Sequence, residues 1–351
     1  MSKRHSNLEN GSNLAEKTLR IGMVRLTDAA PFIIAGEMGL FKEQGLEVRL
    51  SWELGWASIR HKIAYGELDA AHAIAPMALS ISTGVDVAAT PCRAIMVLNR
   101  LGDAITLSHE LYERGVRSGD DFRQEIKSTR GKKRYTLGIV SHDSTHNILL
   151  RQWLKSLDLD PDNDVRLVII PPGQALRNLR AKTLDGYCVG EPWNSLAVRE
   201  GIGWCPVLSH DIEQDHVEKI LLARENDYIE KQDQFDSLAK ALRISCEYCA
   251  DPENASVVAK KMRRTSYLGA ASHGMEKCLL GEFDRGIGNG FKNEEVIRFC
   301  SGEDTEFSIS DKAWLINGAH DAGWLKTTKS EGHGLADRIF SGNALTALDV
   351  S

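Results

Sequence analysis

Short β-rich runs alternate with helical stretches from residue 18 onward, and this order constrains the fold more than any other feature. Residues 18–26, 46–53 and 68–75 are rich in apolar and β-branched side chains and are expected to form strands. The stretches between them, 27–45 and 56–64, have the spacing of helices with one apolar face. Strands that alternate with helices predict βαβ units and a mostly parallel sheet.

The same order returns later in the chain. Residues 135–159 follow the order strand, loop and long helix, and residues 164–201 repeat it. We therefore expect a second α/β lobe at 108–205. After about residue 210 the pattern is mostly helical, beginning with residues 216–232. Ligands of such sheets bind beyond the carboxyl ends of the strands, and a cleft between two lobes is a favoured place for them.

Charge and composition narrow the class of protein. The chain has 43 basic and 49 acidic residues, a net charge of −6, which does not indicate a nucleic-acid or membrane surface. No run of 18 apolar residues is present. Residues 1–17 are polar, without the apolar core of a signal peptide, and are expected to form a disordered tail. Together with seven scattered cysteines, this pattern predicts a cytoplasmic chain that contacts neither nucleic acid nor membrane directly.

Sequence motifs do not indicate an enzyme. The GxSxG, Walker, GxGxxG and HExxH patterns are all absent from the sequence. Cys246 and Cys249 lie on an apolar helical face with Phe235 and Leu242, so we expect two buried thiols rather than a redox or zinc pair. We predict no cofactor and no metal site.

Trp56 and His146 are the best candidate donors to a ligand. Trp56 follows a glycine bend, and its indole N–H is a donor without any acceptor capacity. His146 lies where Ser144 or Thr145 can cap a helix, so free amides and the positive dipole end are close to it. A structural or solvent-exposed histidine is the alternative.

Three further residues are weaker candidates on sequence alone. Pro172 and Val189 follow or end predicted strands and are candidate cleft walls, with ordinary turns as the alternative. Lys219 alone suggests a solvated surface residue. The candidate residues include hydrogen-bond donors but no nucleophile beside a base. This combination predicts a protein that binds a small acidic ligand and does not transform it.

Several phrases resemble the nitrate- and bicarbonate-binding family of transporter solute-binding proteins. They are the run at 27–77 and then, in order, THNILLRQWL, VIIPPGQ, DGYCVGEPWN and HVEKILL. The resemblance covers roughly residues 18–325 and implies the type II periplasmic-binding-protein fold, with two α/β lobes, two crossovers and a cleft that closes on its ligand. It implies a first lobe of residues 18–107 plus 206–351 beside the second at 108–205.

The same resemblance implies roles for individual residues. Trp56 matches an anion-facing tryptophan, Ser58 a small residue whose backbone approaches the ligand, and His146 a cleft histidine. Lys219 matches the lysine of the nitrate branch, whereas bicarbonate-type members are acidic there and involve a metal. The apolar walls of the cleft match Pro172 and Val189.

One departure from the family pattern concerns the ligand directly. Asp103 stands near the position of a usual amide, and a carboxylate there repels nitrate. Either Asp103 points away from the ligand, or the role of the amide has moved to Asn99.

The polar N-terminal segment implies a similarity to the cytosolic NasS-type nitrate and nitrite sensors. Such sensors release a NasT-type RNA-binding antiterminator when the anion binds, so that protein is the implied partner. The alternatives are a solute-binding subunit of a nitrate, bicarbonate or organic-anion transporter and, more remotely, an enzyme of the thiamine-pyrimidine-synthesis branch.

Overall fold

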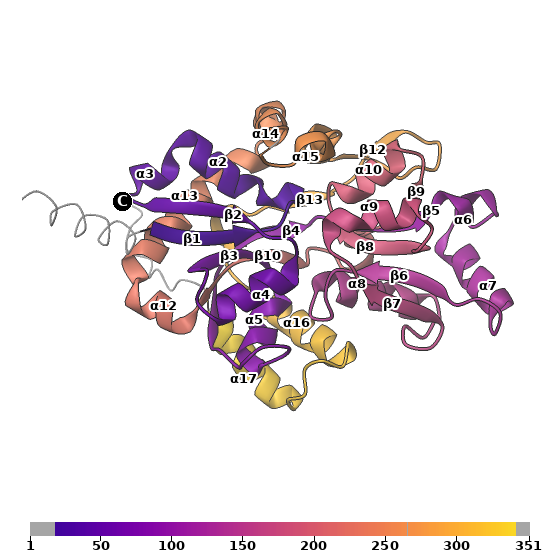
Figure 1. Ribbon diagram of the computed structural model, residues 1–351, viewed down its shortest axis with the longest axis horizontal. Coiled ribbons are helices and arrows are strands. Elements are labelled where there is room, and N and C mark those ends of the chain that lie inside the picture. The colour runs from indigo at the N-terminus through magenta and orange to yellow at the C-terminus, as the bar shows by residue number, and fades with distance from the viewer. Residues whose placement is uncertain (1–17, 265, 342–351) are drawn as a thin grey trace, which may run out of the picture.

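The computed structural model describes residues 18–264 and 266–341, and the tail expected at 1–17 lies outside them. Two α/β lobes lie side by side, each built on its own sheet (Figure 1). The first sheet has six strands in the order β13-β4-β10-β3-β1-β2. Its strands are β1 (Thr18–Met23), β2 (Glu47–Trp52), β3 (Ala70–Ile74), β4 (Cys92–Leu101), β10 (Val217–Arg224) and β13 (Ile297–Phe299).

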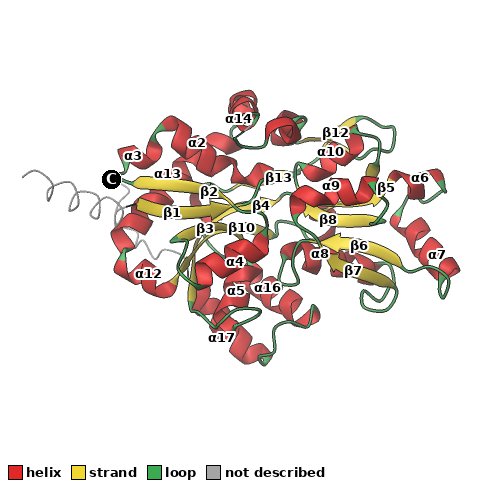
Figure 2. Cartoon of the chain, in the orientation of Figure 1, coloured by secondary structure: helices red, strands yellow, loops and turns green. Residues whose placement is uncertain are grey.

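Helices cover both faces of this sheet (Figure 2). One face packs against α2 and α13 through side chains such as Phe32 and Leu238, and the other against α4 and α5 through Ile59 and Met77. The helices of this lobe are α2 (Ala30–Met38), α3 (Leu40–Glu43), α4 (Trp56–Ala64), α5 (Pro76–Thr83), α12 (Glu225–Glu230), α13 (Gln232–Ala250), α14 (Ala255–Met262), α15 (Met275–Leu279), α16 (Ile309–Asp321) and α17 (Lys329–Ile339).

The second sheet has five strands in the order β7-β6-β8-β5-β9. The strands are β5 (Asp103–Ser108), β6 (Tyr135–Ile139), β7 (Val165–Ile169), β8 (Gly186–Gly190) and β9 (Gly203–Leu208). The helices around them are α6 (His109–Glu113), α7 (Gly119–Thr129), α8 (Thr145–Ser156), α9 (Pro172–Arg180), α10 (Trp193–Arg199) and α11 (Ser209–Ile212). This sheet begins and ends slightly outside the segment 108–205 in which we expected the second lobe.

The chain passes between the lobes twice. It leaves the first sheet at Leu101, which takes a left-handed conformation at φ 61°, and enters β5 after Gly102. It returns after β9, through α11, to β10. A hairpin of β11 (Glu282–Asp284) and β12 (Phe291–Asn293) reaches back to the second lobe, where the Cys205 amide donates to the Arg285 carbonyl at 2.8 Å.

The sheets are mixed, since four strands of each run in one direction but each sheet also holds at least one strand of the opposite direction, which the expectation of a mostly parallel sheet did not include. β1 pairs in parallel with β2 and β3, but β10 runs antiparallel to β3 and β4. In the second sheet, β6 is parallel to β7 and β8, and β5 is antiparallel to β8 and β9. The antiparallel strands β5 and β10 are the first strands after each crossover, because a chain that arrives from the other lobe enters the sheet from the opposite end.

The expectation of a helix at residues 216–232 is also wrong in its first half. Residues Val217–Arg224 form β10, which lies inside the first sheet and is almost wholly buried. A short apolar run flanked by charges has no period that separates a buried strand from a helix. In the described ranges, no helix has the length and apolar character needed to cross a membrane.

Asp69 links β1, β3 and α12, and we expect its charge to stabilise the fold. Its buried carboxylate accepts from Arg20 Nε at 2.8 Å and from Lys231 Nζ at 2.9 Å. Burial by itself raises the pKa of Asp69, but the hydrogen bonds from Arg20 and Lys231 outweigh it and lower the pKa to about 2. Since the folded pKa lies below the unfolded value, the stabilisation is complete above about pH 4 and is lost as the pH falls towards 2.

We therefore expect Asp69→Asn to lower the free energy of unfolding at pH 7 by about 2 kcal/mol. The difference from the unsubstituted protein should shrink progressively below pH 4. Urea titrations across this pH range measure it, with Asp120→Asn as the control, since Asp120 has a largely exposed side chain paired with Arg123. An unchanged stability of Asp69→Asn at pH 7 would contradict the assignment.

Candidate functional site

Charged and aromatic side chains from both lobes converge in a cluster that solvent does not reach. The first lobe contributes residues from its sheet and from the segments that follow β1 and β2, and the second lobe contributes one residue from β5 and one from α8. Every member is at most 2% exposed. We call this set the interlobe cluster, and it consists of Asp28, Trp56, His72, Asp103, His146, Glu218 and Lys219.

The position of each member follows from the local structure. Lys219 pairs with Ile74 of β3 on one side and Asn99 of β4 on the other, so the central strand β10 fixes it at the interlobe edge. Trp56 is the first residue of α4, directly after Gly55. His146 is the second residue of α8, whose first turn is capped by Ser144, which accepts from the Asn147 amide at 3.1 Å.

Lys219 is held by carboxylates of its own chain. Its Nζ lies 2.8 Å from Asp28 Oδ2 and 2.5 Å from Glu218 Oε1. Burial by itself lowers the pKa of Lys219, but the carboxylates of Asp28, Glu218 and Asp103 outweigh it and raise the pKa above its ordinary value. The ammonium also lies 5.5 Å from the centre of the Trp56 ring, within range of a cation–π contact.

His146 is the second basic group of the cluster. Its Nε2 lies 3.0 Å from Asp103 Oδ1 and 3.9 Å from a Glu218 oxygen. Burial disfavours the imidazolium, but the charges of Asp103 and Glu218 outweigh it and raise the pKa of His146. Asp103 shows the reciprocal effect, since burial opposes its charge but His146 brings its pKa below the ordinary value.

Trp56 and His72 complete the cluster on the side of the first lobe. The buried Trp56 Nε1 has no hydrogen-bond partner among residues 18–264 and 266–341, so this donor is available to a ligand. His72 Nε2 lies 3.3 Å from Asp28 Oδ1, and burial lowers the pKa of His72 to about 4. His72 is therefore neutral at pH 7.

The cluster holds more negative than positive groups. Asp28, Asp103 and Glu218 carry three carboxylates, against the ammonium of Lys219 and the imidazole of His146. One donor atom from each of Asp103, His146 and Glu218 lies within 4.8 Å of the others, a spacing at which three such groups could hold a metal ion. The arrangement supplies donors from both lobes to a small anion, but it also presents carboxylates to it.

The structure brings Trp56, His146, Lys219 and Asp103 together, and it answers the question about Asp103. Its side chain faces the cluster and does not point away. Asn99 is also buried, and its Nδ2 donates one of its two hydrogens to the Leu101 carbonyl at 3.1 Å, so the role of Asn99 as the amide donor stays a prediction.

The other expected residues are not members of the cluster. Pro172 begins α9 and Val189 lies in β8, and both side chains are buried. The Ser58 amide donates to the Gly55 carbonyl at 3.1 Å in the first turn of α4, and the approach of the Ser58 backbone to the ligand stays a prediction.

Three members of the cluster were missed by the sequence analysis. Asp28, at the start of the helical stretch 27–45, has the residue type of a helix cap, but it lies in a short 3-10 turn and accepts from Lys219. His72 and Glu218 each interrupt a fully buried strand. A charged or imidazole side chain inside an apolar strand is the signal that points to them, since such groups are buried only with partners.

Comparisons with known proteins find relatives that match most of the chain. The model of the NMT1-like family matches residues 12–263. The chain is 31% identical over 314 residues to the nitrate/nitrite binding protein NrtA of Synechococcus elongatus, covering 86% of this chain and 70% of that protein.

Two longer proteins of Synechocystis are also similar. The nitrate import ATP-binding protein NrtC is 38% identical over 91% of this chain, and the bicarbonate transport ATP-binding protein CmpC is 40% identical over 73% of it. The chain spans 48% of the length of the first and 38% of the second, so it matches about half or less of each.

A solved structure shows the same fold. The periplasmic nitrate-binding protein NrtA of Synechocystis superposes with a TM-score of 0.87 at 22% identity, over 92% of this chain and 86% of that one. The expected periplasmic-binding-protein-like fold of two α/β lobes is thereby confirmed.

Proposed function

The chain belongs to the NMT1-like family, and we propose that it binds nitrate or nitrite between its lobes as a solute-binding protein, without catalysis. The observation that carries this proposal is the convergence of Trp56 Nε1, His146 Nε2 and Lys219 Nζ, donors from both lobes, in a site closed to water. Charge-assisted donors are the stronger partners of an oxyanion. Relatives named for nitrate import and nitrate/nitrite binding support the same ligand.

These names favour the transporter subunit, our alternative from the sequence, over the regulatory role. The cytoplasmic NasS-type sensor with a NasT-type antiterminator as partner remains a prediction without support from the comparisons. A bicarbonate ligand is the second candidate, because CmpC is 40% identical and carboxylates face the site.

A panel of anions tests the ligand. Thermal unfolding is recorded with nitrate, nitrite, bicarbonate, sulfate and chloride, each added as its sodium salt at equal ionic strength. A ligand present at a hundred times its Kd adds about 2.7 kcal/mol to the free energy of unfolding. Stabilisation by nitrate or nitrite supports the proposal, whereas stabilisation by bicarbonate alone, or by no anion, refutes it.

Trp56→Phe tests the indole donor. This change keeps an apolar ring and removes the N–H, so one hydrogen bond to a charged ligand is lost, about 1.5–3 kcal/mol of binding energy. We expect the Kd for nitrate, measured by titration calorimetry, to rise about 10–100-fold.

Trp204→Phe is the matched control for this experiment. Trp204 is equally buried, and its Nε1 also lacks a hydrogen-bond partner in the part of the chain that the structure describes, but it packs in the core of the second lobe. Its substitution should leave the Kd unchanged. Equal effects of the two substitutions would show that Trp56 contributes packing and not a donor.

A further inference from the structure

Gly318 lies where a helix of the first lobe meets a helix of the second. It is buried in the interior of α16, where glycine destabilises a helix relative to alanine. Its backbone is helical, so the conformation at this position does not require a glycine. The reason for a glycine lies instead in what surrounds it.

The side chain of Ile148, in α8, fills the space beside Gly318. A β-carbon added at Gly318 would lie 2.6 Å from Ile148 Cγ2, 2.7 Å from Cδ1 and 2.9 Å from Cγ1. Ile148 is only 1% exposed, and a β-branched side chain in a helix has one strongly preferred rotamer, so it does not readily turn aside. An alanine at position 318 therefore requires α8 and α16 to move apart.

The helix α16 is fixed to the first lobe. Arg100 of β4 donates to both carboxylate oxygens of Asp311, at 2.7 and 2.9 Å, near the start of the helix. The helix α17 packs against α16 and also against α5 and β4. On the side of the second lobe, Lys155 Nζ of α8 lies 2.8 Å from Asp321 Oδ2 of α16. Gly318 is therefore part of a contact between the lobes.

The helix α8 also carries a member of the interlobe cluster. Ile148 follows His146 by two residues in the same helix, so a displacement of α8 at Ile148 moves the imidazole as well. His146 Nε2 lies 3.9 Å from a Glu218 oxygen of the first lobe, and both side chains are fully buried. Moving α8 away from α16 would widen this gap and admit water to it.

We propose that Gly318 is a positioning residue for the anion site. Because it has no side chain, α16 lies directly against Ile148, and this contact holds α8, with His146, against the first lobe. The effect on nitrate rests on the proposed function, whereas the contact between the lobes does not depend on the ligand.

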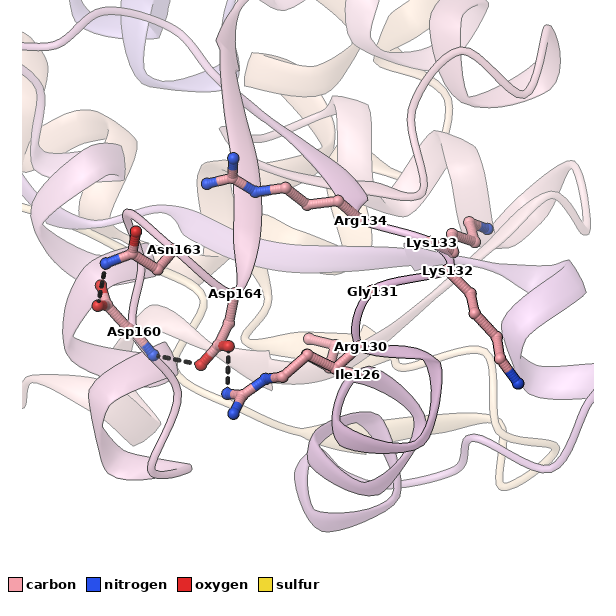
Figure 3. Close-up of a pocket in the computed structure, with 9 residues that line it drawn as sticks. All are labelled: Ile126, Arg130, Gly131, Lys132, Lys133, Arg134, Asp160, Asn163 and Asp164. Carbon is pink, nitrogen blue, oxygen red and sulfur yellow. Dashed lines mark hydrogen bonds and ion pairs between the residues drawn. The ribbon is translucent and has the colours of Figure 1, made fainter.

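A hollow at the surface of the second lobe provides a comparison, because residues of that lobe alone form it (Figure 3). In this hollow Arg130 pairs with Asp164, and the Asp160 amide donates to Asp164 Oδ2 at 2.9 Å. The Lys132 side chain points away from these carboxylates. A change at Lys132 should therefore not alter how the lobes meet.

Gly318→Ala tests the contact, with nitrate binding measured by titration calorimetry on the full chain. We expect the Kd for nitrate to rise about 10-fold, because overpacking opposes the closed form that binds the ligand. Gly334→Ala, in α17, is the matched control, since a β-carbon there meets no atom of the described chain within 4 Å. Gly334→Ala and Lys132→Ala should both leave the Kd unchanged.

A second substitution shows whether Ile148 is the partner of Gly318. Ile148→Ala removes Cγ1, Cγ2 and Cδ1, the three atoms that the new methyl group would meet. In this background, adding Gly318→Ala should change the Kd less than about 2-fold, because the effects of residues in contact are not additive. An equal rise of the Kd in both backgrounds would overturn the inference. A Kd of Gly318→Ala within about 2-fold of the unsubstituted protein would also overturn it.

Small-angle scattering without nitrate separates this inference from the proposed function. If the unsubstituted chain binds no nitrate, the proposed function is refuted, and the radius of gyration of the ligand-free chain decides the inference. We then expect a larger radius in Gly318→Ala, and no such increase when the same change is added to Ile148→Ala. An unchanged radius in that case overturns the contact as well. So does a loss of cooperative unfolding in Gly318→Ala, which would mean that the contact belongs to the core of one lobe.

Discussion

Lys219→Met is expected to lower the free energy of unfolding by about 3–5 kcal/mol at pH 7, because it leaves buried carboxylates without their cation. The Nζ atom lies 2.8 Å from Asp28 and 2.5 Å from Glu218, in a place that water does not reach. Methionine has a similar volume, so the loss reports the charge and not a cavity. Chemical denaturation of the two proteins measures the difference.

A second substitution separates charge from packing. Glu218→Gln in the Lys219→Met background removes one of the stranded carboxylates, so the double variant should be more stable than Lys219→Met alone. A stability of Lys219→Met within about 1 kcal/mol of the unsubstituted protein would show that Lys219 is not the charge partner of these groups, since an uncompensated buried charge costs more.

The same variant should lose nitrate binding. An ammonium that donates to an oxyanion contributes about 1.5–3 kcal/mol, and its removal also leaves the carboxylates facing the ligand. We expect the Kd for nitrate to rise more than about 100-fold. The comparison with Lys231→Met, a lysine paired with Asp69 outside the interlobe cluster, distinguishes a local effect from a general loss of stability.

Some members of the interlobe cluster could be predicted from sequence motifs, and others could not. Trp56, His146 and Lys219 lie in recognisable phrases, and the structure brings them together with Asp103. The roles of Asp28 and Glu218 could not be predicted, because they depend on contacts between segments far apart in the chain. Asp28, for example, reads as a helix cap until β10 brings Lys219 to it.

The fold shows the same division between local and long-range information. The strand β3 and helices such as α4 and α8 follow from local periodicity. The direction of β5 and β10 does not, since it depends on the side from which the chain enters each sheet. The strand β10 could not be distinguished from a helix in the sequence, because its buried apolar run has no strand or helix period.

A second buried network joins the lobes beside the interlobe cluster, and it carries the last prediction. Asp143, in the turn before α8, is fully buried and accepts hydrogen bonds from Ser80 of the first lobe and Ser141 of the second. Arg60 of α4 lies 3.5 Å from Asp143 and 2.8 Å from Asp86, whose side chain is largely exposed. Opening the lobes would hydrate Asp143, so the pairing with Arg60 favours the closed form.

Arg60→Met should therefore weaken nitrate binding although Arg60 is not a member of the interlobe cluster. With the arginine gone, the buried Asp143 keeps only hydroxyl partners, and the cost of about 3 kcal/mol falls on the closed form and not on the open one. A ligand that binds the closed form then loses affinity by the same free energy, about 100-fold in Kd. Asp86→Asn removes only the exposed partner of Arg60 and should change the Kd less than about 5-fold.

Two measurements on these variants distinguish closure from contact. Calorimetry gives the Kd for nitrate, and small-angle scattering gives the radius of gyration of the ligand-free chain, which should increase in Arg60→Met as the open form becomes more populated. Saturating nitrate should return the radius to that of the unsubstituted protein, because ligand and Arg60 stabilise the same form. An unchanged Kd with an unchanged radius would show that the Arg60–Asp143 pair contributes to the fold without setting the balance between open and closed lobes.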